Sequence, residues 1–123
     1  MSRVGHFEIP ADNPDRVAEF YKQVLGWVIQ KWEGPVDYWL ISTGKNNEPG
    51  INGGIARKKD RPASGVLVTA QVDFVDECLK KIILAGGSVV VPKQAIPGVG
   101  YQAHFRDPDG NVIGIMENDP PAL

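Results

Sequence analysis

Apolar residues recur at helical spacing in two segments of the chain. In the first they follow the i, i+3, i+4, i+7, i+8 spacing of a helix with one face toward a core, at Val17, Phe20, Tyr21, Val24 and Leu25. Asn13 suits the N-cap of this helix, Pro14 its first position and Gly26 its end. The second segment should be capped by Asp73, should stop at residues 86–87, and has the inward stripe Val75, Cys78, Leu79, Ile82 and Ile83.

Shorter apolar runs, bounded by glycine, proline and asparagine, predict strands around both helices. The predicted strands cover residues 4–9, 27–32, 37–42, 51–57, 66–72, 88–91, 101–106 and 112–117. Pro92 should end the sixth strand, because proline has no N–H to donate to a sheet. The segment 107–111, Asp-Pro-Asp-Gly-Asn, is typical of a hairpin turn between the last two strands.

The two halves of the chain have the same plan. A shift of 61 positions places Asp12 on Asp73 and Gly26 on Gly87. Each half reads as a strand, a helix and three strands, so we expect module one at about residues 1–57, a charged linker at 58–65 and module two at 66–118. The predicted class is α+β, a single domain in which two tandem βαβββ modules form one curved, eight-stranded mixed sheet around a cavity.

Composition narrows the possible partners. The 123 residues carry a net charge of −2 and no basic stripe, so no nucleic acid partner is expected. No apolar run approaches the ~20 residues that cross a bilayer, and no membrane partner is expected. The N-terminus lacks the apolar run of a signal peptide, and the single cysteine, Cys78, cannot form an internal disulfide. We therefore expect a cytoplasmic protein. Cys78 lies on the apolar stripe of the second predicted helix, where we expect it to be a buried packing residue.

Three segments, in this order and combined with the internal repeat, carry a resemblance to a known family. They are His6-Phe7-Glu8-Ile9 leading to Phe20-Tyr21 and Leu25-Gly26-Trp27, the helix unit from Val72-Asp73 to Gly86-Gly87, and Asp107-Pro108-Asp109-Gly110-Asn111. The chain resembles the vicinal oxygen chelate superfamily, which includes glyoxalase I, bleomycin resistance proteins and extradiol dioxygenases. The resemblance implies a glyoxalase-like fold and a homodimer, but not a particular reaction, because one fold carries many functions.

Metal-dependent members of this superfamily bind a divalent ion in the cavity, through the first and fourth strands of each module. Among these four positions, His6 matches. The other three are apolar or lack a side chain: Leu67, Gly53 and Gly114, although Gly53 could be misaligned by one residue. Glu117 is no substitute for Gly114, because an odd separation along a strand places the two on opposite faces. Since catalytic metal sites need about three protein ligands, no cofactor is predicted, and a divalent metal stays a minor alternative.

His6 and Glu8 are the candidate catalytic residues. They lie two apart on one predicted strand, so they share a face, and the resemblance makes that face the cavity side. An imidazole beside a carboxylate can act as an acid/base pair, each group shifting the proton affinity of the other. A hydrogen-bonded structural pair at a sheet or dimer surface is the alternative interpretation.

The candidate ligand-binding residues lie on two other predicted strands. Gln102, His104 and Arg106 alternate along the seventh strand and could contact an anionic or carbonyl group. Tyr101 and Phe105 would then point toward the core. On the third strand, Trp39 and Tyr38 face opposite ways, so one of them should enter the cavity and could stack on a planar ligand; Trp39 is included as a candidate.

Three functions remain open at this point. The first is a metal-independent protein or enzyme that binds a small-molecule ligand among these residues. The second is a metal-dependent lyase or dioxygenase of the same superfamily. The third is a drug-sequestering resistance protein, for which the slight negative charge is permissive.

Overall fold

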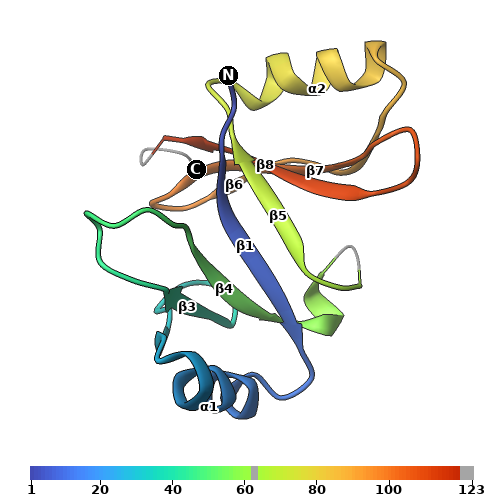
Figure 1. Ribbon diagram of the computed structural model, residues 1–123. Coiled ribbons are helices and arrows are strands. Elements are labelled where there is room, and N and C mark those ends of the chain that lie inside the picture. The colour runs from blue at the N-terminus through green and yellow to red at the C-terminus, as the bar shows by residue number, and fades with distance from the viewer. Residues whose placement is uncertain (62–63, 120–123) are drawn as a thin grey trace. The chain divides into compact units, whose positions relative to one another are not determined.

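The computed structural model describes residues 1–61 and 64–119 and is shown in Figure 1. The chain divides into two compact units. We call His6–Val66 the N-terminal unit, and Met1–Gly5 together with Leu67–Leu123 the C-terminal unit. No helix of the described ranges is long and apolar enough to cross a membrane.

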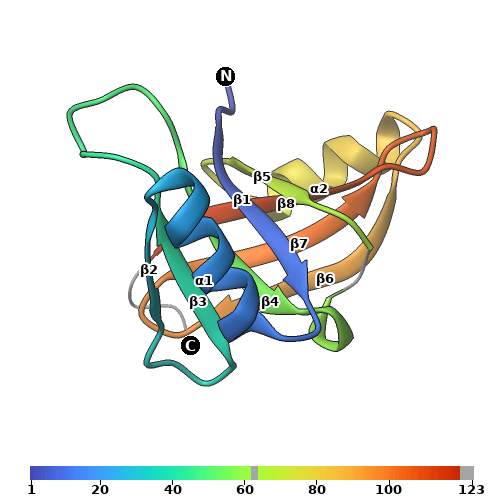
Figure 2. The same cartoon turned by 60° about the horizontal axis from the view of Figure 1, so that its bottom comes forward.

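The N-terminal unit contains four strands and one α-helix. Its elements are β1 (Val4–Ala11, which begins just before the unit), α1 (Pro14–Leu25), β2 (Val28–Lys31), β3 (Tyr38–Ser42), β4 (Asn52–Arg57) and the short 3-10 helix η1 (Lys58–Asp60). The strand order is β2-β3-β4-β1, in which β2, β3 and β4 are antiparallel neighbours. β1 and β4 are parallel, which is possible because α1 and two strands separate them along the chain. Figure 2 shows α1 and β3 from below.

Helix α1 begins and ends as predicted. The Asn13 side chain accepts the Arg16 N–H at 3.2 Å, Pro14 occupies the first turn, and Gly26 closes the helix in the left-handed conformation with φ of 70°. Its orientation differs from the prediction, because Phe20 and Val24 are 57% and 60% exposed. The helix meets the sheet along its small residues, so the inward face is Pro14, Val17, Ala18 and Tyr21.

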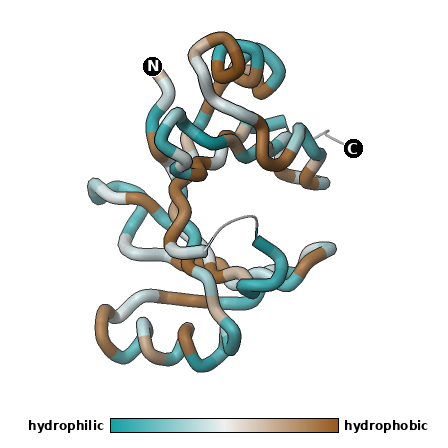
Figure 3. The backbone as a smooth tube through the Cα atoms, turned by 90° about the vertical axis from the view of Figure 1, so that its right-hand side faces the viewer, coloured by the Kyte–Doolittle hydropathy of each residue, from teal (hydrophilic) through white to brown (hydrophobic). Residues whose placement is uncertain are grey.

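Strand β1 alternates between the helix-covered core and the opposite face. Its odd-numbered residues pack in a core with α1 and the strands, which comprises Ile9, Ala11, Ala18, Ile29, Trp39, Ile41 and Ile55, with Phe7, Val17, Tyr21 and Trp27 at its edge. The even-numbered residues of β1 therefore face away from α1. Figure 3 shows that apolar and polar segments alternate along the strands and both helices.

The C-terminal unit repeats the plan of the N-terminal one. It contains β5 (Leu67–Gln71), α2 (Val75–Leu84), β6 (Ser88–Ile96), β7 (Gly100–Arg106) and β8 (Val112–Asn118), with strand order β5-β8-β7-β6. β5 and β8 are parallel, and the other neighbours are antiparallel. Its core consists of Val72, Val75, Ala103 and Ile115, with Ala70, Cys78, Leu79, Ile82, Tyr101 and Phe105 beside them. Eight strands, two α-helices and mixed pairing confirm the predicted α+β class.

Two predicted boundaries in this unit are wrong. β6 continues past Pro92 to Ile96, because it ends the strand order, and register shifts on both sides of Val91 accommodate the proline. Asp73 does not cap α2. The helix begins at Val75, whose N–H donates to the Glu117 carboxylate of β8 at 2.9 Å, and a tertiary contact thus replaces the local cap.

Candidate functional site

The face of β1 that carries His6 and Glu8 lies opposite the face covered by α1. Phe7 and Ile9 pack in the core under the helix, so the intervening His6 and Glu8 point away from it. Both side chains are half-buried rather than solvated. The structure therefore brings these two predicted residues together on one face of the N-terminal unit.

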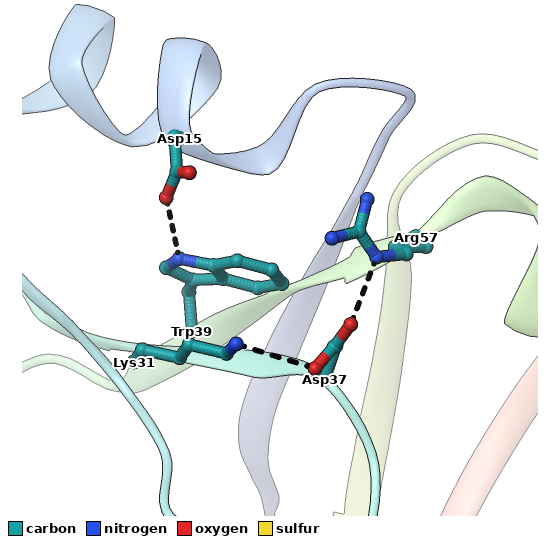
Figure 4. A network of polar contacts seen from close by, with 5 residues as sticks. All are labelled: Asp15, Lys31, Asp37, Trp39 and Arg57. Atoms are coloured by element: carbon teal, nitrogen blue, oxygen red, sulfur yellow. Dashed lines mark hydrogen bonds and ion pairs between the residues drawn. The ribbon is translucent and has the colours of Figure 1, made fainter.

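Strand β3 contributes Tyr38, and not Trp39, to this face. Trp39 is 5% exposed in the core, and its indole N–H donates to Asp15 of α1 at 3.0 Å. Lys31 and Arg57 each lie 5.4 Å from the centre of the indole ring and also pair with Asp37, as Figure 4 shows. The expected alternation of the two aromatic residues is correct, but these contacts place Trp39 on the helix side.

Tyr38 is in direct contact with His6. Its hydroxyl oxygen lies 2.6 Å from His6 Nε2, a short hydrogen bond, and the two rings stack with centroids 6.1 Å apart. Trp32 meets Tyr38 edge-on, with ring centroids 6.5 Å apart. The imidazole of His6 thus contacts both the ring and the hydroxyl of Tyr38, and Trp32 in turn packs against Tyr38.

Glu8 is paired with Arg61, which follows η1. Arg61 Nε lies 2.6 Å from Glu8 Oε1, and the side chains are 1% and 14% exposed respectively. Arg61 lies in the segment 58–65, which was expected to be a charged linker, and its side chain is buried rather than solvated; residues 62–63 of that segment lie outside the described residues. A carboxylate that is largely removed from water, such as that of Glu8, is destabilised unless a cation lies nearby. Arg61, in the charged segment after β4, provides that cation.

The proton affinities of the two ring residues follow from this arrangement. Burial lowers the pKa of His6, and the negative charge of Glu8 offsets part of that effect. Burial raises the pKa of Tyr38 well above its ordinary value; the charge of Glu8 and a hydrogen bond to Glu8 raise it further, whereas Arg61 lowers it. Both rings are therefore neutral near pH 7.

The glycines at the expected metal-ligand positions make room for other side chains. A Cβ on Gly54 would overlap the ring of Tyr38, and a Cβ on Gly53 would approach the Phe7 carbonyl oxygen to 2.5 Å. Gly54 is the register partner of Glu8, so it is Gly54, one residue from the aligned Gly53, that shares the face of His6. The volume that a carboxylate would take in a metal site is occupied here by Tyr38.

The predicted residues of β7 form a row of their own in the C-terminal unit. Tyr101 and Phe105 pack against the α2 core, as expected. Gln102, His104 and Arg106 take the opposite face and are half-buried, buried and exposed in that order. A Cβ on Gly114 would lie 2.7 Å from Thr69 Oγ1 and 3.5 Å from His104 Nε2, so these two side chains fill the space over Gly114. Sequence reasoning did not identify Thr69.

The donor set does not fit the metal site that the resemblance implies. Across residues 1–61 and 64–119, no three His, Cys, Asp or Glu side chains converge in a way that could hold a metal ion. Leu67 is buried and apolar, Gly53 and Gly114 have no donor atoms, and Glu117 is engaged at α2. We therefore derive no chemistry through a metal.

A surface hollow of about 320 Å³ lies elsewhere, in the C-terminal unit. It is lined by Met1, Arg3, Gln71, Val72, Asp73 and Asn118. It contains neither histidine and no buried charge, so the candidate site is the His6 face and not this hollow.

Comparisons with known proteins agree with this architecture. The family model described as Glyoxalase/Bleomycin resistance protein/Dioxygenase superfamily matches residues 3–115. The chain belongs to this superfamily. Proteins called "Putative glyoxylase CFP32" from Mycobacterium bovis and Mycobacterium tuberculosis are each 28% identical to it over 119 residues, which is 92% of this chain and 43% of theirs. The chain thus spans less than half the length of these relatives.

Solved structures share the fold at low sequence identity. Methylmalonyl-CoA epimerase from Mycobacterium tuberculosis superposes with a TM-score of 0.71 at 14% identity, covering 95% of this chain and 88% of the epimerase chain. A superfamily member from Vibrio splendidus 12B01 gives 0.66 at 17% identity, covering 96% and 100%. A structure described as NAD-dependent benzaldehyde dehydrogenase from Legionella pneumophila gives 0.68 at 21%, covering 93% and 98%. The glyoxalase-like fold predicted from the sequence is confirmed.

Proposed function

We propose that the protein binds a small molecule on the His6–Glu8 face of the N-terminal unit, without a metal ion, and that His6 exchanges a proton with that molecule. The observation that carries this proposal is the 2.6 Å contact between His6 Nε2 and the Tyr38 hydroxyl, beside the buried ion pair of Glu8 and Arg61 on the same face of the sheet. His6 contributes a titratable imidazole, which is the group best suited to proton transfer near neutral pH.

Burial of these groups has a cost that a purely structural role does not require. Removing a carboxylate and a guanidinium from water costs several kcal/mol per ion, and an apolar pair of similar volume is often as stable. Perturbed ionisable residues that are held together in this manner are enriched at functional sites. The depressed pKa of His6 also keeps its imidazole neutral, and hence available as a base, near pH 7.

The absence of suitable ligands at three of the four superfamily positions supports the metal-independent form of the proposal. Tyr38 and Thr69 occupy the spaces over Gly54 and Gly114. A metal ion would have to displace Tyr38 from His6 and would still find a single matched donor. The neutral Tyr38 hydroxyl and the imidazole are the groups that a ligand oxygen would contact on this face.

The test combines a binding screen with proton exchange. Purified protein would be screened by thermal shift against 2-oxo acids, thiol adducts of aldehydes, acyl thioesters and cationic drugs, each with and without Zn²⁺, Ni²⁺ or Mn²⁺. Compounds that stabilise the protein would then be incubated in D₂O, and NMR would follow replacement of carbon-bound hydrogen. We expect stabilisation without metal, and hydrogen exchange that His6→Gln abolishes.

A Lys80→Gln variant is the matched control, because Lys80 is exposed on α2 and lies in the other unit. It should leave both readouts unchanged. If stabilisation occurs with the metals alone, or if His6→Gln exchanges hydrogen as fast as the unmodified protein, the proposal is wrong.

A further inference from the structure

We propose that Tyr38 is a positioning residue that fixes the tautomer of His6: its hydroxyl donates to Glu8 and accepts the Nε2 proton of His6, which leaves Nδ1 as the basic nitrogen. The inference rests on the proposed function in one respect, namely that His6 exchanges a proton. It adds which of the two ring nitrogens does so, and which neighbouring residues decide it.

The first step concerns Glu8, which can only accept hydrogen bonds. Its Oε1 lies 2.6 Å from Nε of Arg61, whose guanidinium remains charged and is almost completely buried. Glu8 and Arg61 form an ion pair, and the carboxylate of an ion pair can only accept hydrogen bonds. Any group that hydrogen-bonds to the remaining lone pairs of Glu8 must therefore be a donor.

The second step concerns the single proton of the Tyr38 hydroxyl. The Tyr38 ring and hydroxyl lie over Gly54, which is the register partner of Glu8, so the hydroxyl lies beside the Glu8 side chain on the same face of the sheet. The hydrogen bond of Tyr38 to Glu8 also contributes to the raised pKa of the phenol. The phenolic proton is thus directed at Glu8.

The third step follows for His6. If the single hydroxyl proton of Tyr38 is donated to Glu8, the hydroxyl oxygen can only accept a hydrogen bond from His6. That oxygen lies 2.6 Å from His6 Nε2. Two lone pairs at that distance would repel each other, and Nε2 must carry the proton. In the opposite arrangement Tyr38 would donate to Nε2, and its oxygen lone pair would then face the Glu8 carboxylate. The buried charge of Glu8 disfavours this arrangement.

The consequence is a directional base. Neutral His6 accepts a proton at Nδ1, and the resulting imidazolium donates its Nε2–H to Tyr38, which in turn donates to Glu8. The negative charge of Glu8, held in place by Arg61, therefore stabilises the protonated state through one intervening hydroxyl.

The tautomer can be measured without a ligand. Protein labelled with ¹⁵N-histidine contains His6 and His104, and a His104→Asn variant assigns the two sets of signals. Long-range ¹H–¹⁵N correlation spectra at about pH 8, above the ordinary histidine pKa of about 6.5, distinguish the two neutral tautomers. We expect His6 to show the limiting shifts of a single Nε2–H tautomer. Limiting shifts of the Nδ1–H tautomer would overturn the proposal.

A Glu8→Gln variant gives the sharpest outcome. Arg61 should retain the amide oxygen, so the amide –NH₂ turns toward Tyr38 and donates to its oxygen. Tyr38 must then donate to His6, and the Nε2–H form should fall from the dominant to the minor tautomer. Glu19→Gln, at an exposed position on α1, is the matched control and should change nothing. An unchanged His6 tautomer in a folded Glu8→Gln protein would overturn the inference.

Tyr38→Phe provides a second test that does not disturb the buried ion pair. The phenyl ring retains the packing over Gly54 and against Trp32 but loses the hydroxyl. The shifts of His6 should move from their limits toward values averaged between two tautomers, which loss of packing alone would not cause. Unmoved shifts would count against Tyr38 as the positioning residue. If His6 shows the expected tautomer but no compound binds or exchanges hydrogen, only the proposed function is refuted. If compounds bind and exchange hydrogen but His6 shows the other tautomer, only this inference is refuted.

Discussion

Replacing Gly54 with alanine should destabilise the protein, although alanine is usually the better residue in a folded chain. Gly54 is not among the glycines with positive φ, so its backbone conformation suits alanine. By itself this change would stabilise the protein by about 0.4–1 kcal/mol, because it reduces the conformational freedom of the unfolded chain. The opposing effect is steric, since the new Cβ would overlap the ring of Tyr38.

The size of the steric effect can be bounded from the environment of the ring. Tyr38 is half-buried between Trp32 and His6, and its backbone belongs to the paired strand β3, so the ring can escape only by rotating toward solvent. Overpacking of this kind costs about 1–3 kcal/mol. Rotation would also break the hydrogen bond to His6, worth about 1 kcal/mol. After subtraction of the gain from alanine, a net loss of about 1–3.5 kcal/mol in the free energy of unfolding is expected.

A double-mutant cycle measures the interaction energy between a Cβ at position 54 and the Tyr38 side chain. Its four proteins, each unfolded with urea, are the unmodified chain, Gly54→Ala, Tyr38→Ala and the double variant. When Tyr38 is alanine the clash is absent, and Gly54→Ala should be neutral or stabilising by up to about 1 kcal/mol. Gly5→Ala is the control, since a Cβ on Gly5 of β1 would meet no atom within 4 Å. Equal losses from Gly54→Ala in both backgrounds would refute the assignment of this glycine to Tyr38.

Two further predictions concern the helix cap and the pH dependence of stability. Glu117→Ala removes the acceptor of the Val75 N–H and should lower the free energy of unfolding by about 1 kcal/mol in urea titrations. Glu117→Gln retains an acceptor oxygen and should therefore lose much less stability. Equal losses in both variants would contradict the role of Glu117 as the cap of α2. Because the folded pKa of His6 lies below its unfolded value of about 6.5, the unfolded chain binds more protons between those two values, and stability should fall as pH decreases below about 6.5. Subtracting the profile of a His6→Asn protein isolates this contribution, and superimposable profiles would argue against the shift.

Local chemistry predicted the elements well, because their signals lie within a few residues of one another. Asn13, Pro14 and Gly26 delimit α1 through backbone hydrogen bonds and dihedral preferences that depend only on neighbouring residues. The shared face of His6 and Glu8 follows from the two-residue period of a strand. The α2 start was misplaced because its acceptor, Glu117, comes from a strand far along the chain.

The rotation of α1 shows a similar limit. The spacing of its apolar residues identified a helix with an apolar stripe, yet Phe20 and Val24 lie outside the core. Which part of a broad stripe turns inward depends on how closely the helix axis approaches the sheet. That approach is set by the small residues Pro14 and Ala18 against β-strand side chains, and no local pattern encodes it.

The sequence by itself determined the repeated βαβββ plan, the superfamily resemblance and the presence of Leu67, Gly53 and Gly114 at three positions where the resemblance implies metal ligands. Each of these depends on residue identity and on position along the chain. Only the tertiary structure showed that Tyr38 rather than Trp39 joins His6, and that Arg61 neutralises Glu8. These pairings join residues 32 and 53 positions apart, and they form because a buried polar group must find a partner wherever the folded chain supplies one.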